Sequence, residues 1–356
     1  MNADTKPINL SLSTPEQVIK LEDEKSGLQG VIVVHSTALG PAAGGCRFWR
    51  YPSLACAQND ALRLAAGMSY KNALADLPLG GGKAVIKVPA HDFSRNELFK
   101  AFGRAVDSLA GEYVTAEDVG TTVEDMACAS KATRHVAGLA NVPGRPGGDP
   151  SPHTARGVFE AMKVAIEYRL GRPLSGSRVA VQGLGNVGFR LCEMLHEAGA
   201  ELVISETRSD VATVAVDRFG ADIAEGLAIY DAQVDVFAPC ALGGALDPET
   251  AQRLRAKVVC GGANNQLAMP EVGQILSDRD ILYAPDYLVN AGGIINVAGE
   301  YLGWSCDEVA DRVSAIAPRL QALLELAERE RITTDRAADE MAEETIKGAG
   351  RRVRAA

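Results

Sequence analysis

The stretch Arg178–Gly188, RVAVQGLGNVG, decides the fold of this chain. Its first half is apolar and predicts a short buried strand, and the residues after it predict a helix. Three glycines in a G-x-G-x-x-G pattern, at 183, 185 and 188, stand at that junction. Such glycines allow a tight turn, let the backbone approach a pyrophosphate, and let the helix pack closely on the strand. The free N–H groups at the helix start attract phosphate, so Asn186 and Val187 are predicted to contact a dinucleotide.

An acidic residue ends the next predicted strand and supports the same reading. Glu206 stands at about the 20-residue spacing expected for a carboxylate that binds the ribose hydroxyls. A carboxylate repels a 2′-phosphate, so Glu206 favours NAD over NADP. Arg208 could pair with that phosphate, which keeps NADP open as the alternative. The simpler reading is a glycine turn in an α/β domain that binds no nucleotide.

Length and composition limit the possible classes. The chain has 356 residues, of which 47% are hydrophobic and 23% charged, so it can bury two cores and is not a disordered protein. A net charge of −10 argues against a nucleic-acid partner. No apolar run approaches the roughly 20 residues that span a bilayer, and the first residues show no signal-peptide pattern. We therefore expect a cytoplasmic protein with no membrane partner.

The cysteines predict neither disulfides nor a metal site. Their number is odd, and no two have the C-x-x-C spacing typical of zinc or redox motifs. No cluster of His, Cys and Asp has metal-ligand spacing either. Reduced thiols fit a cytoplasmic compartment. The seven cysteines are 46, 56, 128, 192, 240, 260 and 306.

The chain is predicted to form two α/β domains with a cleft between them. Asn141–Pro152 is rich in Pro and Gly and indicates a linker. After it, strands and helices alternate, which is typical of a parallel sheet covered on both faces. The predicted domains are 1–147, a Rossmann dinucleotide-binding domain over 148–325, and a helical segment, 326–356, that returns to the first domain.

The first domain contains a strand, a glycine-rich segment and a helix before its polar residues. Leu28–Ser36 predicts a strand, Leu39–Arg47 is a Gly/Pro segment, and Ala57–Leu74 predicts a helix. The glycine run Gly80–Gly82 leads into the short strand AVIKV. This run is not a phosphate loop, because it lacks the required spacing and precedes a strand, not a helix.

Three ionisable residues of this domain are of the types that carry out proton transfer. Lys71 ends the Ala/Leu helix, Lys83 follows the glycine run, and Asp118 ends a predicted strand. A neighbouring cation and burial both favour the neutral form of a lysine amine, which can then act as a general base. The alternative for the lysines is a solvated surface position. Asp118 could equally be a loop carboxylate or a helix cap.

A longer set of ordered motifs carries a resemblance to a known family. The stretches are LGPAAGGCR, GMSYKNA, LPLGGGKAVI, TAEDVGT, QGLGNVG, FAPCALGG, GGANNQL and APDYLVNAGGIINVAGE. In this order they resemble the amino-acid dehydrogenases that act on glutamate, leucine, phenylalanine and valine. The resemblance covers residues from about 28 to 305 and is strongest to the leucine and phenylalanine branch. It implies a homo-oligomer whose first domain binds substrate and mediates assembly.

The resemblance also implies roles for individual residues. Lys71 would bind the substrate carboxylate, Lys83 would assist attack of water on the imino acid, and Asp118 would carry protons to and from the amino group. Further substrate contacts would come from Gly44, Gly45, Asn264 and Asn290. Cofactor contacts would come from Thr154, Asn264, Cys240 and Ala241. The implied reaction is reversible, NAD-dependent oxidative deamination of an L-amino acid to a 2-oxo acid, ammonia and NADH.

Four apolar residues are predicted to contact the substrate side chain and so bear on which amino acid is bound. Glutamate dehydrogenases of the family hold the substrate side-chain carboxylate with a Lys and a Ser, at the positions of Ala43 and Val297 here. Because burying an unpaired carboxylate is costly, glutamate is disfavoured. Ala116, Ile294 and Val297 resemble the leucine type, whereas the small Ala43 resembles the phenylalanine type. We expect branched-chain substrates, leucine first, with phenylalanine as the alternative and tryptophan still open.

Two other classes are weaker readings. A 2-hydroxy-acid dehydrogenase needs a His–carboxylate pair, and none of the five histidines stands in such a motif. A non-catalytic nucleotide-binding module would be expected to lack Lys83 or Asp118, and both are present.

Overall fold

The computed structural model describes residues 14–355, with side chains through residue 350. Its internal contacts divide the chain into two compact units. The N-terminal unit contains the described residues from 14 to Asp149, then Ile294–Val309, and again the residues from Ala342. The parallel-sheet unit contains Pro150–Gly293 and Ala310–Met341. The sequence placed 294–309 in the dinucleotide domain, and it placed the return to the first domain at 326, so both differ from these bounds.

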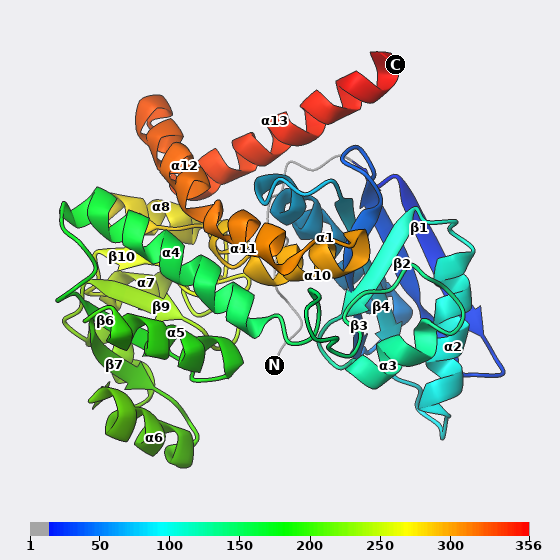
Figure 1. The fold of residues 1–356 in the computed structure, drawn as a ribbon, viewed down its shortest axis with the longest axis horizontal. Coiled ribbons are helices and arrows are strands. Elements are labelled where there is room, and N and C mark those ends of the chain that lie inside the picture. Colours follow the sequence, from blue (N-terminus) through cyan, green and yellow to red (C-terminus); the bar gives the residue numbers. More distant parts are fainter. Residues whose placement is uncertain (1–13, 356) are drawn as a thin grey trace. The chain divides into compact units, whose positions relative to one another are not determined.

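The N-terminal unit is built on a mixed five-stranded sheet (Figure 1). Its strand order is β1-β2-β4-β3-β5. β1 and β2 are antiparallel, β2 and β4 are antiparallel, and β3 runs parallel to both β4 and β5. The strands are β1 (Gln17–Asp23), β2 (Leu28–Ser36), β3 (Ala42–Trp49), β4 (Gly80–Lys87) and β5 (Tyr113–Glu117).

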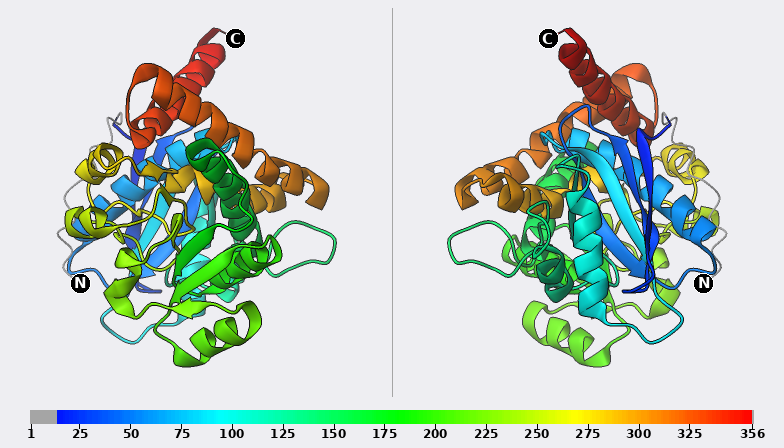
Figure 2. Two further views of the ribbon diagram at one scale, coloured as in Figure 1. Left: turned by 90° about the vertical axis from the view of Figure 1, so that its left-hand side faces the viewer. Right: turned by 90° about the vertical axis from the view of Figure 1, so that its right-hand side faces the viewer.

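Helices cover both faces of this sheet, as the views in Figures 1 and 2 show. Successive side chains of a strand point to opposite faces, and β2 follows this rule. Val31 and Val33 pack with α1 (Leu54–Leu74), whereas Ile32 and Val34 belong to the core formed with α2 and α3. The bounds of these two helices are Arg95–Asp107 and Val123–Ala129. The middle of β2, Val31–Val34, is therefore a continuous apolar run because both faces of the strand are buried there.

Close backbone packing explains why glycines fill the middle of this sheet. A Cβ on Gly44 would lie 1.9 Å from the carbonyl oxygen of Gly82, and a Cβ on Gly81 would lie 2.1 Å from the backbone nitrogen of Ser69 in α1. The segment that the sequence presented only as Gly/Pro-rich is thus strand β3, in which glycine is a steric requirement. Low strand propensity concealed this strand because propensity reflects packing context.

The parallel-sheet unit has the doubly wound topology that the glycine motif predicts. Its six strands are all parallel in the order β11-β10-β9-β6-β7-β8. Counted from the first strand of the unit, this is the order 3-2-1-4-5-6, read from β8, that is typical of dinucleotide-binding sheets. The strands are β6 (Arg178–Gln182), β7 (Glu201–Ser205), β8 (Asp222–Ile223), β9 (Val236–Pro239), β10 (Val258–Val259) and β11 (Leu282–Tyr283).

Helices lie on both sides of the parallel sheet (Figure 1). One core joins sheet residues such as Val203 and Phe237 to Ala251 of α7 and Leu276 of α8. α4 begins inside the predicted linker, with a proline in its first turn, where proline's missing N–H costs nothing. The helices are α4 (Ser151–Leu170), α5 (Asn186–Glu197), α6 (Ser209–Phe219), the 3₁₀ helix η1 (Gly226–Asp231), α7 (Pro248–Arg253), α8 (Glu271–Asp278), α9 (Asp286–Val289) and α12 (Ile316–Glu330).

Three further helices contain the crossings from one unit to the other: α10 (Gly292–Leu302), α11 (Cys306–Ser314) and α13 (Thr334–Ala355). Within the N-terminal unit, Glu300 of α10 accepts hydrogen bonds from the backbone nitrogens of Gly138 (2.8 Å) and Leu139 (3.0 Å). Tyr70 of α1 donates to Glu343 of α13 at 3.0 Å. Across the described residues, no helix has the length and apolarity to cross a membrane.

Candidate active site

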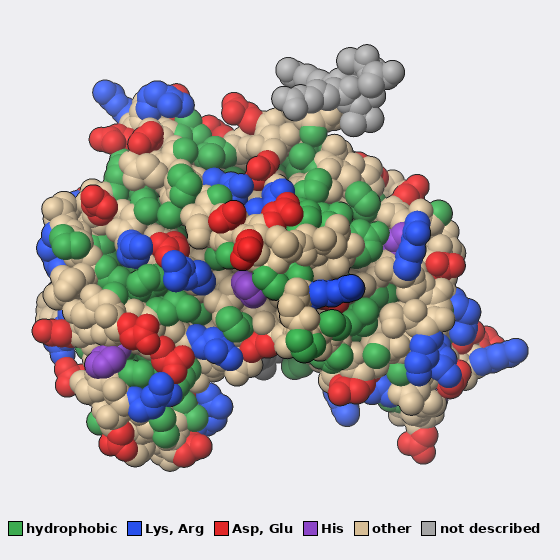
Figure 3. All heavy atoms as spheres, in the orientation of Figure 1, with side chains coloured by type: hydrophobic (Ala, Val, Ile, Leu, Met, Phe, Trp, Pro, Cys, Tyr) green, Lys and Arg blue, Asp and Glu red, His purple; other side chains and the backbone are tan. Residues whose placement is uncertain are grey.

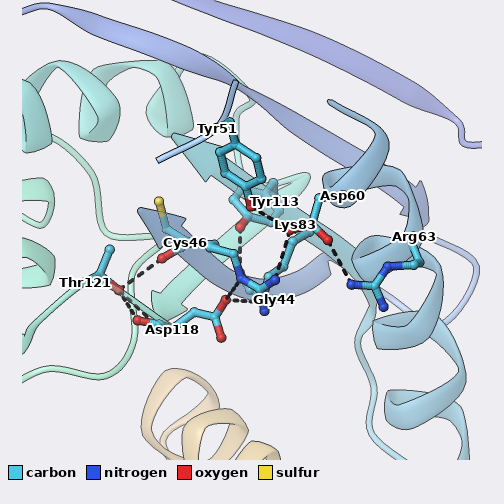
Figure 4. Close-up of polar contacts among 10 residues, drawn as sticks. Gly44, Cys46, Tyr51, Asp60, Arg63, Lys83, Tyr113, Asp118 and Thr121 are labelled. Atoms are coloured by element: carbon cyan, nitrogen blue, oxygen red, sulfur yellow. Dashed lines mark hydrogen bonds and ion pairs between the residues drawn. The ribbon is translucent and has the colours of Figure 1, made fainter. Parts of the chain in front are cut away.

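An ion pair between Lys83 and Asp118 forms the centre of the candidate site (Figure 4). Lys83 lies on β4 and Asp118 directly follows β5, and the Lys83 Nζ to Asp118 Oδ2 distance is 2.8 Å. The lysine side chain is only 7% exposed, whereas the aspartate is 22% exposed. The sequence predicts a neighbouring cation and burial as influences on Lys83; the structure confirms that the side chain is buried and adds a carboxylate in direct contact with its amine.

Opposing influences set the charge of Asp118. Burial raises the pKa of this carboxyl, but the cations Lys83 and Arg47 and the hydrogen bond from Lys83 lower it by more. The net pKa of Asp118 therefore lies below its usual value. Because a carboxyl with a low pKa is ionised near neutral pH, Asp118 is a proton acceptor in the resting site.

Arg47 extends this ion pair into a chain of charges that the sequence did not reveal. Arg47 Nε lies 3.3 Å from Asp118 Oδ2, and Arg47 Nη1 lies 2.9 Å from Asp60 Oδ2. Asp60, on α1, also accepts from Tyr51 at 2.6 Å and pairs with Arg63 at 2.8 Å. The signal that could have identified Arg47 is its place two residues after Gly45 on one strand, which puts both on the same face.

The glycines of β3 leave space for these polar groups. A Cβ on Gly45 would lie 2.7 Å from Asp118 Cβ, so any side chain there would displace the aspartate. The carbonyl oxygen of Gly44 accepts a 2.6 Å hydrogen bond from the hydroxyl of Tyr113. Thr121 Oγ1 accepts from the backbone nitrogen of Asp118 at 2.9 Å and donates to the carbonyl of Cys46 at 3.0 Å. These contacts hold the Asp118 loop against β3.

The remaining predicted substrate residues of the N-terminal unit lie on elements next to this network. Lys71 is in the last turn of α1, three residues after Met68, whose Cγ would be 3.2 Å from a Cβ on Gly44. Residues three apart share a helix face, so Lys71 lies on the side of α1 that packs towards β3. Ala43 and Ala116 are both buried, on β3 and β5.

The last two predicted pocket residues, Ile294 and Val297, lie on α10 and also belong to the N-terminal unit. They are three positions apart, so they share one face of the helix, and both are half-buried. Sequence reasoning had placed them in the dinucleotide domain. α10 lies with the N-terminal unit because its Glu300 accepts hydrogen bonds from the backbone nitrogens of Gly138 and Leu139.

The glycine motif of the parallel-sheet unit has the geometry of an anion-binding turn. Gly183 has a φ of +90°, and a Cβ there would lie 2.7 Å from that of Ala241. A Cβ on Gly188 would lie 2.0 Å from the carbonyl oxygen of Gly183, whereas one on Gly185 would meet open space. Gly185 precedes α5, which starts at Asn186 and has no side-chain cap. The first N–H groups of α5 are therefore available for phosphate.

Glu206 and Arg208 are paired beside this turn. Glu206 Oε2 accepts from the backbone nitrogen of Leu184 at 2.7 Å and lies 3.3 Å from Arg208 Nη2. Burial raises the pKa of Glu206, but the hydrogen bonds from Arg208 and Leu184 lower it to about 2. A cavity of about 450 Å³ opens here, between the start of α5 and the side chains of Arg208 and Val214.

The remaining predicted substrate and cofactor contacts of this unit include two pairs of neighbouring residues. Asn290 is buried and donates to Asn264 Oδ1 at 2.9 Å. Thr154, in the first turn of α4, would have its Oγ1 2.7 Å from a Cβ on Gly293. Both groups belong to loops or helix starts next to glycines, where backbone can approach a ligand closely.

Cys240 and Ala241 lie directly against the glycine turn. Cys240 Sγ is 3.4 Å from the backbone nitrogen of Gly262, and a Cβ on Gly188 would be 3.1 Å from Cys240 Cβ. Burial raises the pKa of the Cys240 thiol to about 11. A thiol with so high a pKa packs the turn and is not a nucleophile at neutral pH.

Neither a grouping of metal-binding side chains among the described residues nor a basic stripe on the face shown in Figure 3 is present. Within it, no three His, Cys, Asp or Glu side chains are grouped to hold a metal ion. On the face shown in Figure 3, Lys and Arg side chains are interspersed with Asp and Glu.

Comparison with known proteins finds the same family over both units. A model described as "Glu/Leu/Phe/Val dehydrogenase, dimerisation domain" matches residues 15–135. A second, described as "Glutamate/Leucine/Phenylalanine/Valine dehydrogenase", matches residues 149–231 and 204–352.

Individual relatives match nearly the whole chain. A leucine dehydrogenase from Thermoactinomyces intermedius is 47% identical over 93% of this chain and 90% of its own length. A valine dehydrogenase from Streptomyces virginiae is 46% identical over 94% of each. The crystal structure of an L-tryptophan dehydrogenase from Nostoc punctiforme superposes with a TM-score of 0.85 at 40% identity, covering 95% of this chain and 97% of that one.

Proposed function

The chain belongs to the Glu/Leu/Phe/Val dehydrogenase family and is an amino-acid dehydrogenase; on that premise we propose that it catalyses the NAD-dependent oxidative deamination of L-leucine and other branched-chain L-amino acids. The observation that carries the substrate assignment is the 47% identity to a leucine dehydrogenase over 93% of the chain. The reaction yields a 2-oxo acid, ammonia and NADH.

We assign the proton-transfer steps to the ion pair of Lys83 and Asp118 in the N-terminal unit. Lys83 holds the water that attacks the imino acid, and Asp118 carries protons to and from the amino group. Their 2.8 Å separation supports direct proton exchange between them. Lys71 holds the substrate carboxylate, and the backbone at Gly44 and Gly45 borders the substrate. Lys83 is buried, so its electrostatic interactions are screened less by water than those of a surface lysine.

The glycine turn of the parallel-sheet unit fits a nicotinamide dinucleotide. Open space at Gly185 and the uncapped start of α5 suit the pyrophosphate, and Glu206 suits the ribose hydroxyls. We assign NAD, not NADP, because Glu206 is ionised and engages the nearby Arg208. When bound, the nicotinamide accepts the hydride from the substrate α-carbon. Thr154, Asn264, Asn290, Cys240 and Ala241 are assigned to its surroundings.

Apolar residues support the choice of substrate. Ala43 and Val297 cannot pair with a carboxylate, and an unpaired buried carboxylate is costly, so glutamate is excluded from the proposal. Ala116, Ile294 and Val297 suit a branched aliphatic side chain. The small Ala43 favours a second candidate, an aromatic substrate such as phenylalanine or tryptophan.

A substrate panel tests the proposal. We expect NADH formation with leucine and valine at a kcat/KM at least roughly tenfold above that for phenylalanine, since one methylene is worth about 1–3 kcal/mol. NADP should replace NAD poorly. No NADH with any amino acid would reject deamination, and a higher kcat/KM for phenylalanine or tryptophan would reject the substrate assignment only.

Assembly and compartment complete the proposal. We assign a homo-oligomer, because residues 15–135 match a dimerisation domain. We assign a cytoplasmic location, because all seven cysteines are unpaired. Light scattering after gel filtration tests the first assignment, and a single-chain mass would reject it.

A further inference from the structure

We propose that Arg47 is a positioning residue that holds Asp118 in place and ionised, and that Asp60 orients Arg47 for this task. The inference deepens the proposed function, since it concerns the proton-transfer group of that reaction. It rests on one geometric fact: a single guanidinium bridges a carboxylate of the candidate active site and a carboxylate of α1, at 3.3 Å and 2.9 Å.

Both cations contact the same oxygen of Asp118. Lys83 Nζ and Arg47 Nε lie 2.8 Å and 3.3 Å from Oδ2. In Figure 4 the second oxygen of Asp118 points away from these contacts and carries no drawn interaction. Oδ2 therefore fixes the carboxylate, and Oδ1 is the oxygen that exchanges a proton with substrate. A carboxylate held by one oxygen keeps its orientation through a proton-transfer cycle.

Asp60 fixes the direction of the guanidinium. Its Oδ2 accepts from Arg47 Nη1 and from the Tyr51 hydroxyl (2.6 Å), and its Oδ1 pairs with Arg63 (2.8 Å). Burial raises the pKa of Asp60, but Tyr51 and Arg47 lower it by more, so Asp60 stays charged. A planar guanidinium with several donors can bridge two carboxylates, whereas a lysine amine at this place could reach only one of them well.

The titratable groups that interact with Asp118 come from three strands. Lys83 on β4 and Arg47 on β3 contact it, whereas Cys46 on β3 and Tyr113 on β5 lie close enough for its charge to affect their pKa values. Burial raises the pKa of Cys46 and of Tyr113 well above their usual values, so both are neutral. The two cations, the hydrogen bond from Lys83 and a backbone hydrogen bond at Val119 therefore offset the effect of burial on Asp118. Loss of Arg47 leaves Lys83 as the cation that lowers the pKa of Asp118, so this pKa should rise.

The experiment measures kinetics and acid stability of Arg47→Met and Arg47→Lys in the full-length enzyme. For Arg47→Met we expect kcat with leucine to fall by about 10- to 100-fold, the effect of misplacing a catalytic group, with little change in KM. The acidic limb of kcat/KM should move up by about one pH unit. Arg47→Lys should recover part of both. Arg253→Met, which breaks an Arg–Asp pair in the other unit, serves as the matched control.

A double-variant cycle separates positioning from mere structural support. The drop in Tm on acidification should be smaller in Arg47→Met than in wild type, because a less depressed pKa of Asp118 leaves less stability for acid to remove. This difference should shrink in an Asp118→Asn background, where the loss of Arg47 acts only on Asp60. If Arg47→Met does not fold, Asp60→Asn takes its place, with a smaller kcat loss in the same direction.

Several results would overturn the inference. These are an unchanged kcat and pH profile in Arg47→Met, the same losses in Arg253→Met, or a difference in acid-induced Tm loss that is undiminished without Asp118. Failure of the proposed function is distinguishable, because it would appear as a wild-type enzyme inactive on leucine. The acid-stability cycle needs no activity and still tests the link between Arg47 and Asp118.

Discussion

Replacing Lys83 by methionine should weaken folding and abolish activity, and the two effects can be separated. Methionine keeps the length of the side chain but removes its charge. Asp118 would then remain 22% exposed with only Arg47, at 3.3 Å, as a partner. Removing one partner of a buried ion pair costs about 3–5 kcal/mol. Because Asp118 keeps Arg47 and some water contact, we expect about 2–3 kcal/mol, or roughly 5 °C in Tm.

The double variant Lys83→Met/Asp118→Asn removes the uncompensated charge. It should recover at least about 1 kcal/mol of the lost stability, because a neutral amide needs no counter-ion. Both variants should lose at least about 100-fold in kcat, the usual contribution of general acid–base groups. Thermal unfolding followed by tryptophan fluorescence and NADH absorbance with leucine provide the two measurements.

Acid gives an independent check with a defined sign. The pKa of Asp118 is lowered below 3.8 in the folded protein. Its contribution to stability is therefore complete above that value and is lost as the pH falls through the lowered pKa. In Lys83→Met the pKa of Asp118 rises, so acid should remove less stability from this variant than from wild type. Near-normal turnover in Lys83→Met would refute the proton-transfer role. An unchanged Tm and acid response would refute the energetic importance of the ion pair.

Two further substitutions test the cofactor and substrate sides. Glu206→Ser removes the carboxylate that repels a 2′-phosphate and releases Arg208 from its 3.3 Å ion pair. The ratio of kcat/KM for NADP to that for NAD should therefore rise at least roughly tenfold, which corresponds to about 1.4 kcal/mol. An unchanged ratio would contradict the assignment of Glu206. Gly45→Ala places a Cβ 2.7 Å from Asp118 Cβ, so kcat should fall by about 100-fold. In the matched control Gly348→Ala the new Cβ meets nothing within 4 Å, so turnover should stay unchanged and Tm should rise slightly. Equal activity of the two variants would show that Asp118 tolerates displacement.

The parallel-sheet unit was the part most predictable from sequence. Its strand–turn–helix signal lies within Arg178–Gly188, and the predicted strands at 178–182 and 201–205 coincide with β6 and β7. The glycines there meet local backbone requirements, such as the φ of +90° at Gly183. Requirements of this kind depend on neighbouring residues, so they can be predicted from the sequence without the tertiary structure.

The N-terminal unit was less predictable, because its decisive contacts are remote in sequence. Strand β3 was hidden by glycines whose purpose is backbone packing against β4 and Asp118. The helix start of α4 within a Pro/Gly-rich segment was missed for a related reason, since proline is typical both of linkers and of first helical turns.

Sequence by itself determined the dinucleotide turn, the family and the candidates Lys83 and Asp118, because motifs with fixed spacing and a long ordered resemblance carry that information. Tertiary structure alone decided that Arg47 joins Asp118 to Asp60 and that residues 294–309 belong with the N-terminal unit. The physical reason is that these residues are far apart in the sequence. Their side chains come within about 3 Å of one another only after the sheet has formed, so no local sequence pattern predicts the contacts.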